Sequence, residues 1–134
     1  MKVNGACHCG SVQFEAEIDP EKVMICHCTD CQVLSGTAFR TIVPSLPGTF
    51  KLKSGDIKDY VKTGESGNRR RQCFCPECGS SVYASADEAD PQVFGLRIGV
   101  LDQRDQLDPR LQIWTKSEHD WVDGIGAIKG MEKQ

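Results

Sequence analysis

The residues best suited to chemistry in this sequence are three cysteines within six positions, Cys26, Cys28 and Cys31. Thiolates are common zinc ligands, and a structural zinc site usually has four protein ligands at about 2.3 Å. Three local thiols therefore leave one position to be filled, either by another side chain or by solvent and substrate. An open position would let zinc bind a substrate, lower the pKa of that substrate or polarise its carbonyl group.

Two further cysteine pairs can form a closed metal site. Cys7 and Cys9 are separated by one residue, and Cys75 and Cys78 are separated by two and followed by a glycine. The second pattern is typical of zinc knuckles, in which a tight turn directs both sulfurs at one ion. Its alternative, a thioredoxin-type redox pair, should open a helix, and no helical pattern follows here. Together the two pairs would supply four thiolates to a structural zinc.

A fourth protein ligand is the main alternative to an open three-thiol site. The candidates are Cys73, His27, Asp30 and His119. Cys73 is the strongest of them because it lies two residues before Cys75, although it could equally be a small buried hydrophobic residue. His27, like His8, lies inside a Cys-x-Cys element, where neighbouring side chains point apart. We therefore expect both histidines to face solvent.

Composition and charge exclude several classes of protein. The chain has 134 residues and a formal net charge of −3, so it lacks the basic field that attracts nucleic acid or an anionic membrane. It contains neither an apolar run near the roughly 20 residues that span a bilayer nor an apolar signal segment before the first cysteines. These features predict a cytoplasmic protein. In that reducing compartment, eight clustered cysteines indicate metal binding rather than disulfides.

The strand and turn pattern predicts one mainly β domain over residues 1–134, with little helix. Short alternating or apolar runs, separated by turns rich in Gly, Pro and Asp, are typical of antiparallel strands. The predicted strands cover residues 12–18, 23–25, 38–43, 49–53, 59–63, 81–84, 93–101 and 111–114. The tail from Gly124 is expected to be irregular.

One short helix is expected from Thr29 or Asp30 to Leu34. Either residue can cap the start of a helix, and the Ser-Gly pair that follows Leu34 would stop it. Cys31 would then lie in the first turn, where the helix dipole favours a thiolate.

Arginines and tryptophans near these motifs are candidate substrate contacts. Arg69, Arg70 and Arg71 form a run that is most often a solvated loop, but a guanidinium beside a metal site can hold a substrate carboxylate. We expect Arg70 and Arg71 to bind the substrate or cofactor in this way. Trp114 and Trp121 are expected to pack in the core or at its rim.

The cysteines and their neighbours also form a recognisable overall pattern. Its segments are residues 5–10, 26–31, 35–39, 74–80, 113–117 and 121. This pattern resembles the glutathione-dependent formaldehyde-activating enzyme family, which also takes in centromere protein V. The resemblance implies an Mss4-like β-rich fold with two zinc ions. It implies a structural zinc at Cys7, Cys9, Cys75 and Cys78, and a catalytic zinc at Cys26, Cys28 and Cys31.

The family resemblance implies a carbon–sulfur lyase that joins glutathione and formaldehyde as S-hydroxymethylglutathione. We therefore expect an enzyme acting on glutathione, or another small thiol, and formaldehyde or a related small aldehyde; a homo-oligomer is compatible with the sequence. The alternative is a non-catalytic, zinc-stapled β module that binds a protein partner. A closed second site, or an exposed apolar patch without a pocket, would favour this alternative. A thiol redox sensor would instead need cysteines that oxidise reversibly without metal.

Overall fold

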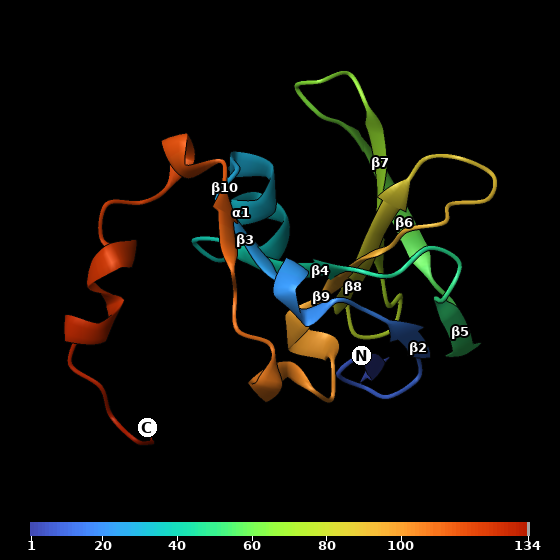
Figure 1. Ribbon diagram of the computed structural model, residues 1–134, viewed down its shortest axis with the longest axis horizontal. Helices are drawn as coiled ribbons and strands as arrows, with labels where there is room; N and C mark the ends of the chain where they lie inside the picture. The colour runs from blue at the N-terminus through green and yellow to red at the C-terminus, as the bar shows by residue number, and fades with distance from the viewer. Residues whose placement is uncertain (134) are drawn as a thin grey trace.

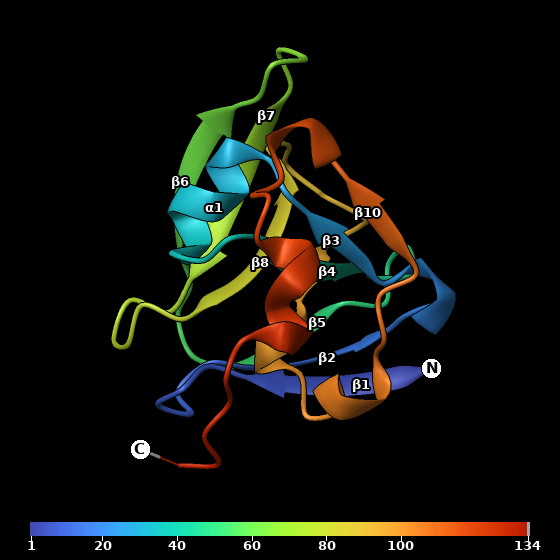
Figure 2. The same cartoon turned by 90° about the vertical axis from the view of Figure 1, so that its left-hand side faces the viewer.

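Two β-sheets form the framework of the computed structural model, which describes residues 1–133; Gln134, the last residue of the predicted domain, lies outside the described residues. The smaller sheet has the strand order β1 (Lys2–Ala6), β2 (Gln13–Glu17) and β5 (Lys51–Ser54), with both pairings antiparallel. β1 and β2 lie at one end of the molecule and the β6–β7 hairpin at the other (Figure 2).

The larger sheet has seven strands in the order β10, β3, β4, β9, β8, β7 and β6 (Figure 1). Their bounds are β3 Met24–Cys26, β4 Arg40–Pro44, β6 Lys58–Thr63, β7 Arg69–Phe74, β8 Ser81–Ala86, β9 Gly95–Arg97 and β10 Leu111–Ile113. β10 pairs with β3 in parallel, and the other pairings in this sheet are antiparallel. The prediction of a mainly β fold is therefore confirmed.

The one α-helix of residues 1–133 is α1 (Thr29–Ser35), which follows β3 directly. Its N-cap is Cys28, whose sulfur accepts a hydrogen bond from the Cys31 backbone N–H, and Gly36 ends it in the left-handed conformation with φ of 68°. The predicted helix is thus confirmed, but the capping residue is a cysteine rather than Thr29 or Asp30. None of the helices among the described residues is long and apolar enough to cross a membrane.

Short 3-10 helices lie between and after the strands. They are η1 (Pro20–Lys22), η2 (Ile98–Val100), η3 (Arg104–Gln106), η4 (Thr115–Ser117) and η5 (Val122–Ala127). The last of them corrects the prediction of an irregular tail from Gly124, because η5 runs through that residue and ends at Ala127.

Side chains from both sheets share one hydrophobic core. It includes Val3 and Phe14 from the smaller sheet and Val43, Val82 and Leu96 from the larger one. All five are almost fully buried, and full burial of a Val, Leu or Phe side chain is worth about 1.5–3 kcal/mol. The alternation of buried and exposed residues along β2 is the pattern that the sequence predicted for this strand.

The structure differs from the sequence-based prediction at three strands, one of which is β7, whose arginine run was expected to be a loop. The other two are β9 and β1. The predicted strand over residues 93–101 is short, because β9 ends at Arg97 and the chain turns through η2 before Leu101 bridges to Gly5. A continuous apolar run records burial and does not distinguish a strand from a buried turn. No pattern in the sequence indicated β1, in which Gly5 interrupts the alternation. A Cβ atom at this glycine would lie 2.3 Å from the Phe14 ring, so close packing of the strand explains the glycine.

Candidate functional site

Four cysteines from two distant turns form the first candidate metal centre. Cys7 and Cys9 lie between β1 and β2, Cys75 and Cys78 lie between β7 and β8, and their sulfurs are all within 4.8 Å of one another. The Cys7–Cys9 and Cys9–Cys75 sulfur distances are 3.5 and 3.8 Å. Zinc–sulfur bonds of about 2.3 Å in a tetrahedron place sulfurs about 3.8 Å apart, whereas a disulfide needs about 2.05 Å. The cluster therefore fits zinc, and its cysteines are free of disulfides.

Hydrogen bonds around this cluster favour the thiolate form that a metal requires. The side chain and backbone of Ser80 lower the pKa of Cys78 to about 5. Burial raises the pKa of Cys7, but the backbone N–H of Val12 and the hydroxyl of Ser11 more than offset it, so that the pKa falls to about 7. Partners of this kind orient metal ligands and adjust their basicity.

Cys26, Cys28 and Cys31 form the second candidate centre, with sulfurs again within 4.8 Å of one another. Cys26 ends β3, Cys28 caps α1 and Cys31 lies in its first turn, so a strand-to-helix turn positions the whole trio. The hydrogen bond between Cys31 and Cys26, together with burial, raises the pKa of Cys31, and the same hydrogen bond lowers the pKa of Cys26. A cation bound at the trio would displace the proton that Cys31 retains.

No fourth cysteine, histidine or carboxylate of residues 1–133 completes the trio. Cys73 is buried on β7, where it pairs with Tyr83 of β8, and burial raises its pKa to about 11. Cys73 had two predicted roles, fourth ligand or small buried hydrophobic residue, and the structure supports the second. Asp30 is ion-paired with Lys62 at 2.5 Å, and His119 is exposed and stacked on Trp121, with ring centroids 6.0 Å apart.

His27 differs from the prediction of a solvent-facing side chain, whereas His8 is exposed as predicted. The His27 side chain is 0% exposed, and its Nε2 lies 2.7 Å from Gln112 Oε1. The physical reason is the β3–β10 pairing: the His27 backbone N–H donates to Ile113 O at 3.0 Å, which brings the C-terminal segment over the ring. The ring is also packed edge-on against Phe39.

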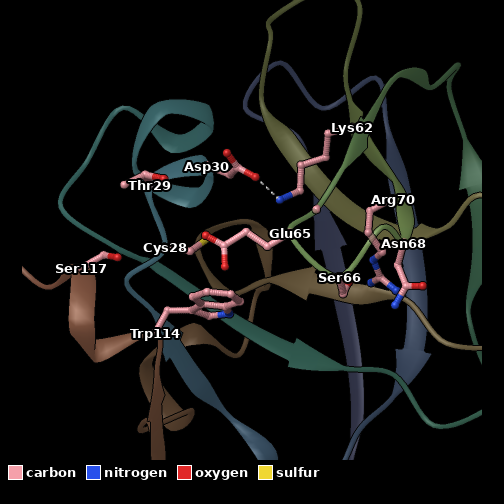
Figure 3. Close-up of a pocket in the computed structure, with 11 residues that line it drawn as sticks. Cys28, Thr29, Asp30, Lys62, Glu65, Ser66, Asn68, Arg70, Trp114 and Ser117 are labelled. Carbon is pink, nitrogen blue, oxygen red and sulfur yellow. Dashed lines mark hydrogen bonds and ion pairs between the residues drawn. The ribbon is translucent and has the colours of Figure 1, made fainter.

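Two cavities that share part of their lining adjoin the trio. Both are lined by Cys28, Lys62, Arg70 and Trp114. The outer cavity, of about 270 Å³, is also lined by Thr29, Asp30, Gly64, Glu65, Ser66, Asn68 and Ser117 (Figure 3). The inner cavity, of about 180 Å³, is also lined by Cys26, Cys31, Leu34, Arg40, Gln72, Ala84 and Arg97. The three-thiol centre is thus accessible to a small molecule.

The two arginines predicted to bind substrate point to different surroundings. Arg70 lines both cavities, whereas Arg71 lines neither and its Nε donates to Asp87 at 2.9 Å. The run is strand β7 rather than a loop. Successive side chains of a strand point to opposite faces of the sheet, so adjacent arginines cannot both enter one cavity.

Trp114 is more exposed than the prediction of core or rim packing implied. Its side chain is 41% exposed, and Trp121 is also exposed. In Figure 3 the Trp114 indole forms part of the wall of the cavity that Cys28 also lines. Gln32 of α1 holds this wall in place, since its side-chain amide donates to both His27 O and Ser117 O at 2.9 Å.

Sequence reasoning missed four residues of the cavity walls: Arg40, Lys62, Gln72 and Arg97. Single basic or amide residues within strands have no distinguishing spacing. The one available signal was the period of two along β7, which places Gln72 on the same face as Arg70. Burial and the charge of Arg40 lower the pKa of Arg97 to about 9.

The fold and site together define a β-rich protein with one closed and one accessible cysteine cluster. Residues 2–117 match the family described as glutathione-dependent formaldehyde-activating enzyme. The chain therefore belongs to this family, whose Mss4-like fold it has, and the family supports a role with glutathione and formaldehyde as small-molecule partners. The chain is also similar to a Rhodobacter sphaeroides protein of known crystal structure. The two share 19% identity and a TM-score of 0.62, over 81% of this chain and 98% of the other, which is a likeness of fold alone.

Proposed function

We propose that this protein is a zinc-dependent enzyme of the carbon–sulfur lyase type, which makes or breaks the adduct of a small thiol with a small aldehyde. Glutathione and formaldehyde are the family's pair. In this proposal, Cys26, Cys28 and Cys31 hold a catalytic zinc, while the four-cysteine cluster of Cys7, Cys9, Cys75 and Cys78 holds a structural one.

One observation carries the proposal: the trio offers three thiols and no fourth ligand among residues 1–133, and it borders two cavities. Catalytic zinc sites keep such a position for substrate, whereas structural sites fill all four. The alternative, a zinc-stapled module for partner binding, predicts a closed second cluster. The accessible trio supports the enzyme.

The outer cavity has the mixed charge that suits glutathione, a tripeptide thiol with two carboxylates and one ammonium group. Lys62 and Arg70 are available to carboxylates, and Asp30 and Glu65 to the ammonium group. The Lys62–Asp30 ion pair is partly exposed, and such pairs contribute only about 0–1 kcal/mol, so a ligand can replace it. Trp114 would pack against the peptide backbone.

The chemistry requires a nucleophilic sulfur held close to a carbonyl carbon. Zinc, when bound, would supply a Lewis acid that keeps the substrate thiol deprotonated near neutral pH. The thiolate sulfur then forms a bond to the aldehyde carbon, the carbonyl π electrons move to oxygen, and that oxygen takes up the proton that the thiol released. The chain's residues hold both partners at this position, which converts an encounter of two molecules into a reaction within one site.

The test is exchange between formaldehyde hydrate and S-hydroxymethylglutathione, followed by NMR with ¹³C-formaldehyde because the uncatalysed adduct also forms. We expect zinc-loaded protein to accelerate exchange. The Cys28→Ser variant should exchange about 100-fold more slowly or slower still, because it would lose the Lewis acid that stabilises the reacting charge. Cys73→Ala is the matched control, since Cys73 is a buried cysteine outside both clusters, and it should keep the wild-type rate within about threefold. Exchange that is equally fast in Cys28→Ser would rule out the assignment of the trio.

A further inference from the structure

The inner cavity has an unusual charge. Four of its lining side chains are basic, namely Arg40, Lys62, Arg70 and Arg97, and no acidic side chain of residues 1–133 lines it. Lys62 has Asp30 as its partner. The three arginines form no ion pair with any carboxylate of the described chain.

Two of these arginines are buried and share one neutral acceptor. The side chains of Arg40 and Arg97 are only 6% and 8% exposed. Arg40 Nη1 and Arg97 Nη2 both donate to Gln72 Oε1, at 3.0 and 2.8 Å, and Arg97 Nε also donates to Ser81 Oγ at 3.4 Å. A guanidinium has five donors, and a buried charge is costly unless it is paired. The pair thus retains unused donors and uncompensated charge beside the cavity.

The thiolates of the neighbouring trio compensate only part of this charge. Cys26 and Arg40 are directly paired in the β3–β4 register. A divalent ion held by three thiolates would leave a single net negative charge. Arg40 and Arg97, the two buried arginines, together bring two positive charges. One further negative charge is needed for balance.

The size of the inner cavity limits what can bring that charge. Its volume is about 180 Å³, the share of about six liquid water molecules at roughly 30 Å³ each. Pockets for larger, drug-sized ligands are roughly 300–1,000 Å³. An anion of two or three carbon atoms would fill a cavity of this size, whereas a tripeptide thiol would extend beyond it. A carboxylate matches the fork of a guanidinium.

We propose that the inner cavity binds the carboxylate of a small oxo acid through Arg40 and Arg97, so that the aldehyde partner of this enzyme is itself an acid. This inference rests on the proposed function for its reaction but not for its binding site. The carboxylate lies on the arginine pair, which directs the aldehyde carbon toward the trio. The thiol sulfur bonds to that carbon, the thiol proton passes to the carbonyl oxygen, and the product is a hemithioacetal; no bond of the carboxylate changes.

Binding is tested first without any reaction. Glycolate carries the carboxylate but no aldehyde, and ethylene glycol is a neutral molecule of similar size. Titration of zinc-loaded protein with each is followed through the arginine Nε–Hε signals by NMR. We expect saturable shifts of two or more signals with glycolate, and affinity for ethylene glycol that is weaker by about tenfold or more. Equal responses to the two compounds, or no response to glycolate, would overturn the proposal.

Gln72→Glu is the sharpest variant, because it places a permanent carboxylate between the two guanidiniums without changing side-chain shape. We expect it to raise the melting temperature and to weaken glycolate binding about tenfold or more. Gln106→Glu makes the same charge change on the exposed turn η3, outside both cavities, and should leave glycolate binding unchanged. Unaltered glycolate binding in a folded Gln72→Glu protein would contradict the proposal.

Two further measurements identify the source of the carboxylate and separate this inference from the proposed function. S-methylglutathione should not displace glycolate; displacement would assign the arginines to the thiol substrate and overturn the proposal. With glutathione as the thiol, the ratio of kcat/KM for glyoxylate to that for formaldehyde should fall about tenfold in Gln72→Glu. Glycolate binding without turnover of either aldehyde would refute the proposed function alone. Turnover of formaldehyde without glycolate binding would refute this inference alone.

Discussion

Trp114 combines an exposed position with a backbone conformation that bulky residues rarely adopt. Its φ is 59°, and it is the only non-glycine residue of the described chain with positive φ. Residues held in this way cost of order 1–3 kcal/mol and cluster at ligand sites. The ring lines both cavities, so the strained position is explained if the ring contacts the substrate.

Comparison of Trp114→Gly with Trp114→Ala separates the ring from the backbone. Both variants lack the ring, so both should raise the KM for glutathione. Only glycine tolerates positive φ without strain, so Trp114→Gly should be more stable than Trp114→Ala by about 1 kcal/mol in urea unfolding. Equal stabilities would show that the left-handed conformation is not retained once the ring is absent. An unchanged KM in both would remove Trp114 from the substrate site.

At the scale of elements, the two faces of strand β7 have different functions: one lines the cavities and the other carries an ion-pair cluster. Arg70 and Gln72 face the cavities, and Arg71 and Cys73 point to the other side of the sheet. There Asp87, just beyond β8, accepts a hydrogen bond from Arg71 and also pairs with Arg69 at 2.8 Å. This cluster ties the open end of the β7–β8 hairpin that carries the cavity residues.

Asp87→Asn tests this tie through pH. The hydrogen bond from Arg71 and the nearby guanidinium charges lower the pKa of Asp87 below its unfolded value of 3.8. The carboxylate therefore stabilises the fold fully above that value, and the contribution is lost as pH falls below 3.8. We expect zinc-loaded wild type to be more stable than zinc-loaded Asp87→Asn at pH 6 in urea unfolding, and the difference to shrink toward zero as the carboxylate is protonated below pH 3.8. Asp108→Asn, an exposed control, should show no such trend. A difference that is constant with pH would contradict the role of the charge.

At the scale of the molecule, the four-cysteine cluster connects the two sheets through turns more than sixty residues apart in the chain. The trio, in contrast, lies within one strand-to-helix turn. Structural zinc sites supply about 10–16 kcal/mol of binding free energy in small domains, which is comparable to the whole stability of a typical fold, about 5–15 kcal/mol. The core shared by the two sheets supports one domain. The assignment of residues 1–134 to a single domain remains a prediction.

Cys78→Ser and Cys28→Ser should therefore differ in effect. We expect about two zinc ions per chain in wild type and about one in Cys28→Ser, with a melting temperature lowered by only a few degrees. Cys78→Ser should lose the structural ion and unfold at least about 10 °C lower. Elemental analysis and thermal unfolding on the same samples make the comparison. Equal losses of stability in the two variants would contradict the division into a structural and a catalytic site.

The sequence by itself predicted both cysteine clusters and most of the strands. Cysteines one or two residues apart in a tight turn must present their sulfurs to one point, so their spacing carries the ligand geometry. The alternation of apolar and polar residues likewise predicted strand β2, because one face of that strand is buried. His27 was wrongly predicted to face solvent because its cover comes from β10, more than eighty residues later.

Only the tertiary structure decided what surrounds the trio. Arg40 reaches Cys26 through the β3–β4 pairing, and Arg97 joins them because β9 pairs with β4. Gln72 comes from β7, beyond β8 in the same sheet. Such positions depend on which strands are neighbours and in which register, and long-range pairing leaves no mark in the local order of residues. The sequence therefore determined the candidate metal ligands, and the sheet determined the charge and size of the cavity beside them.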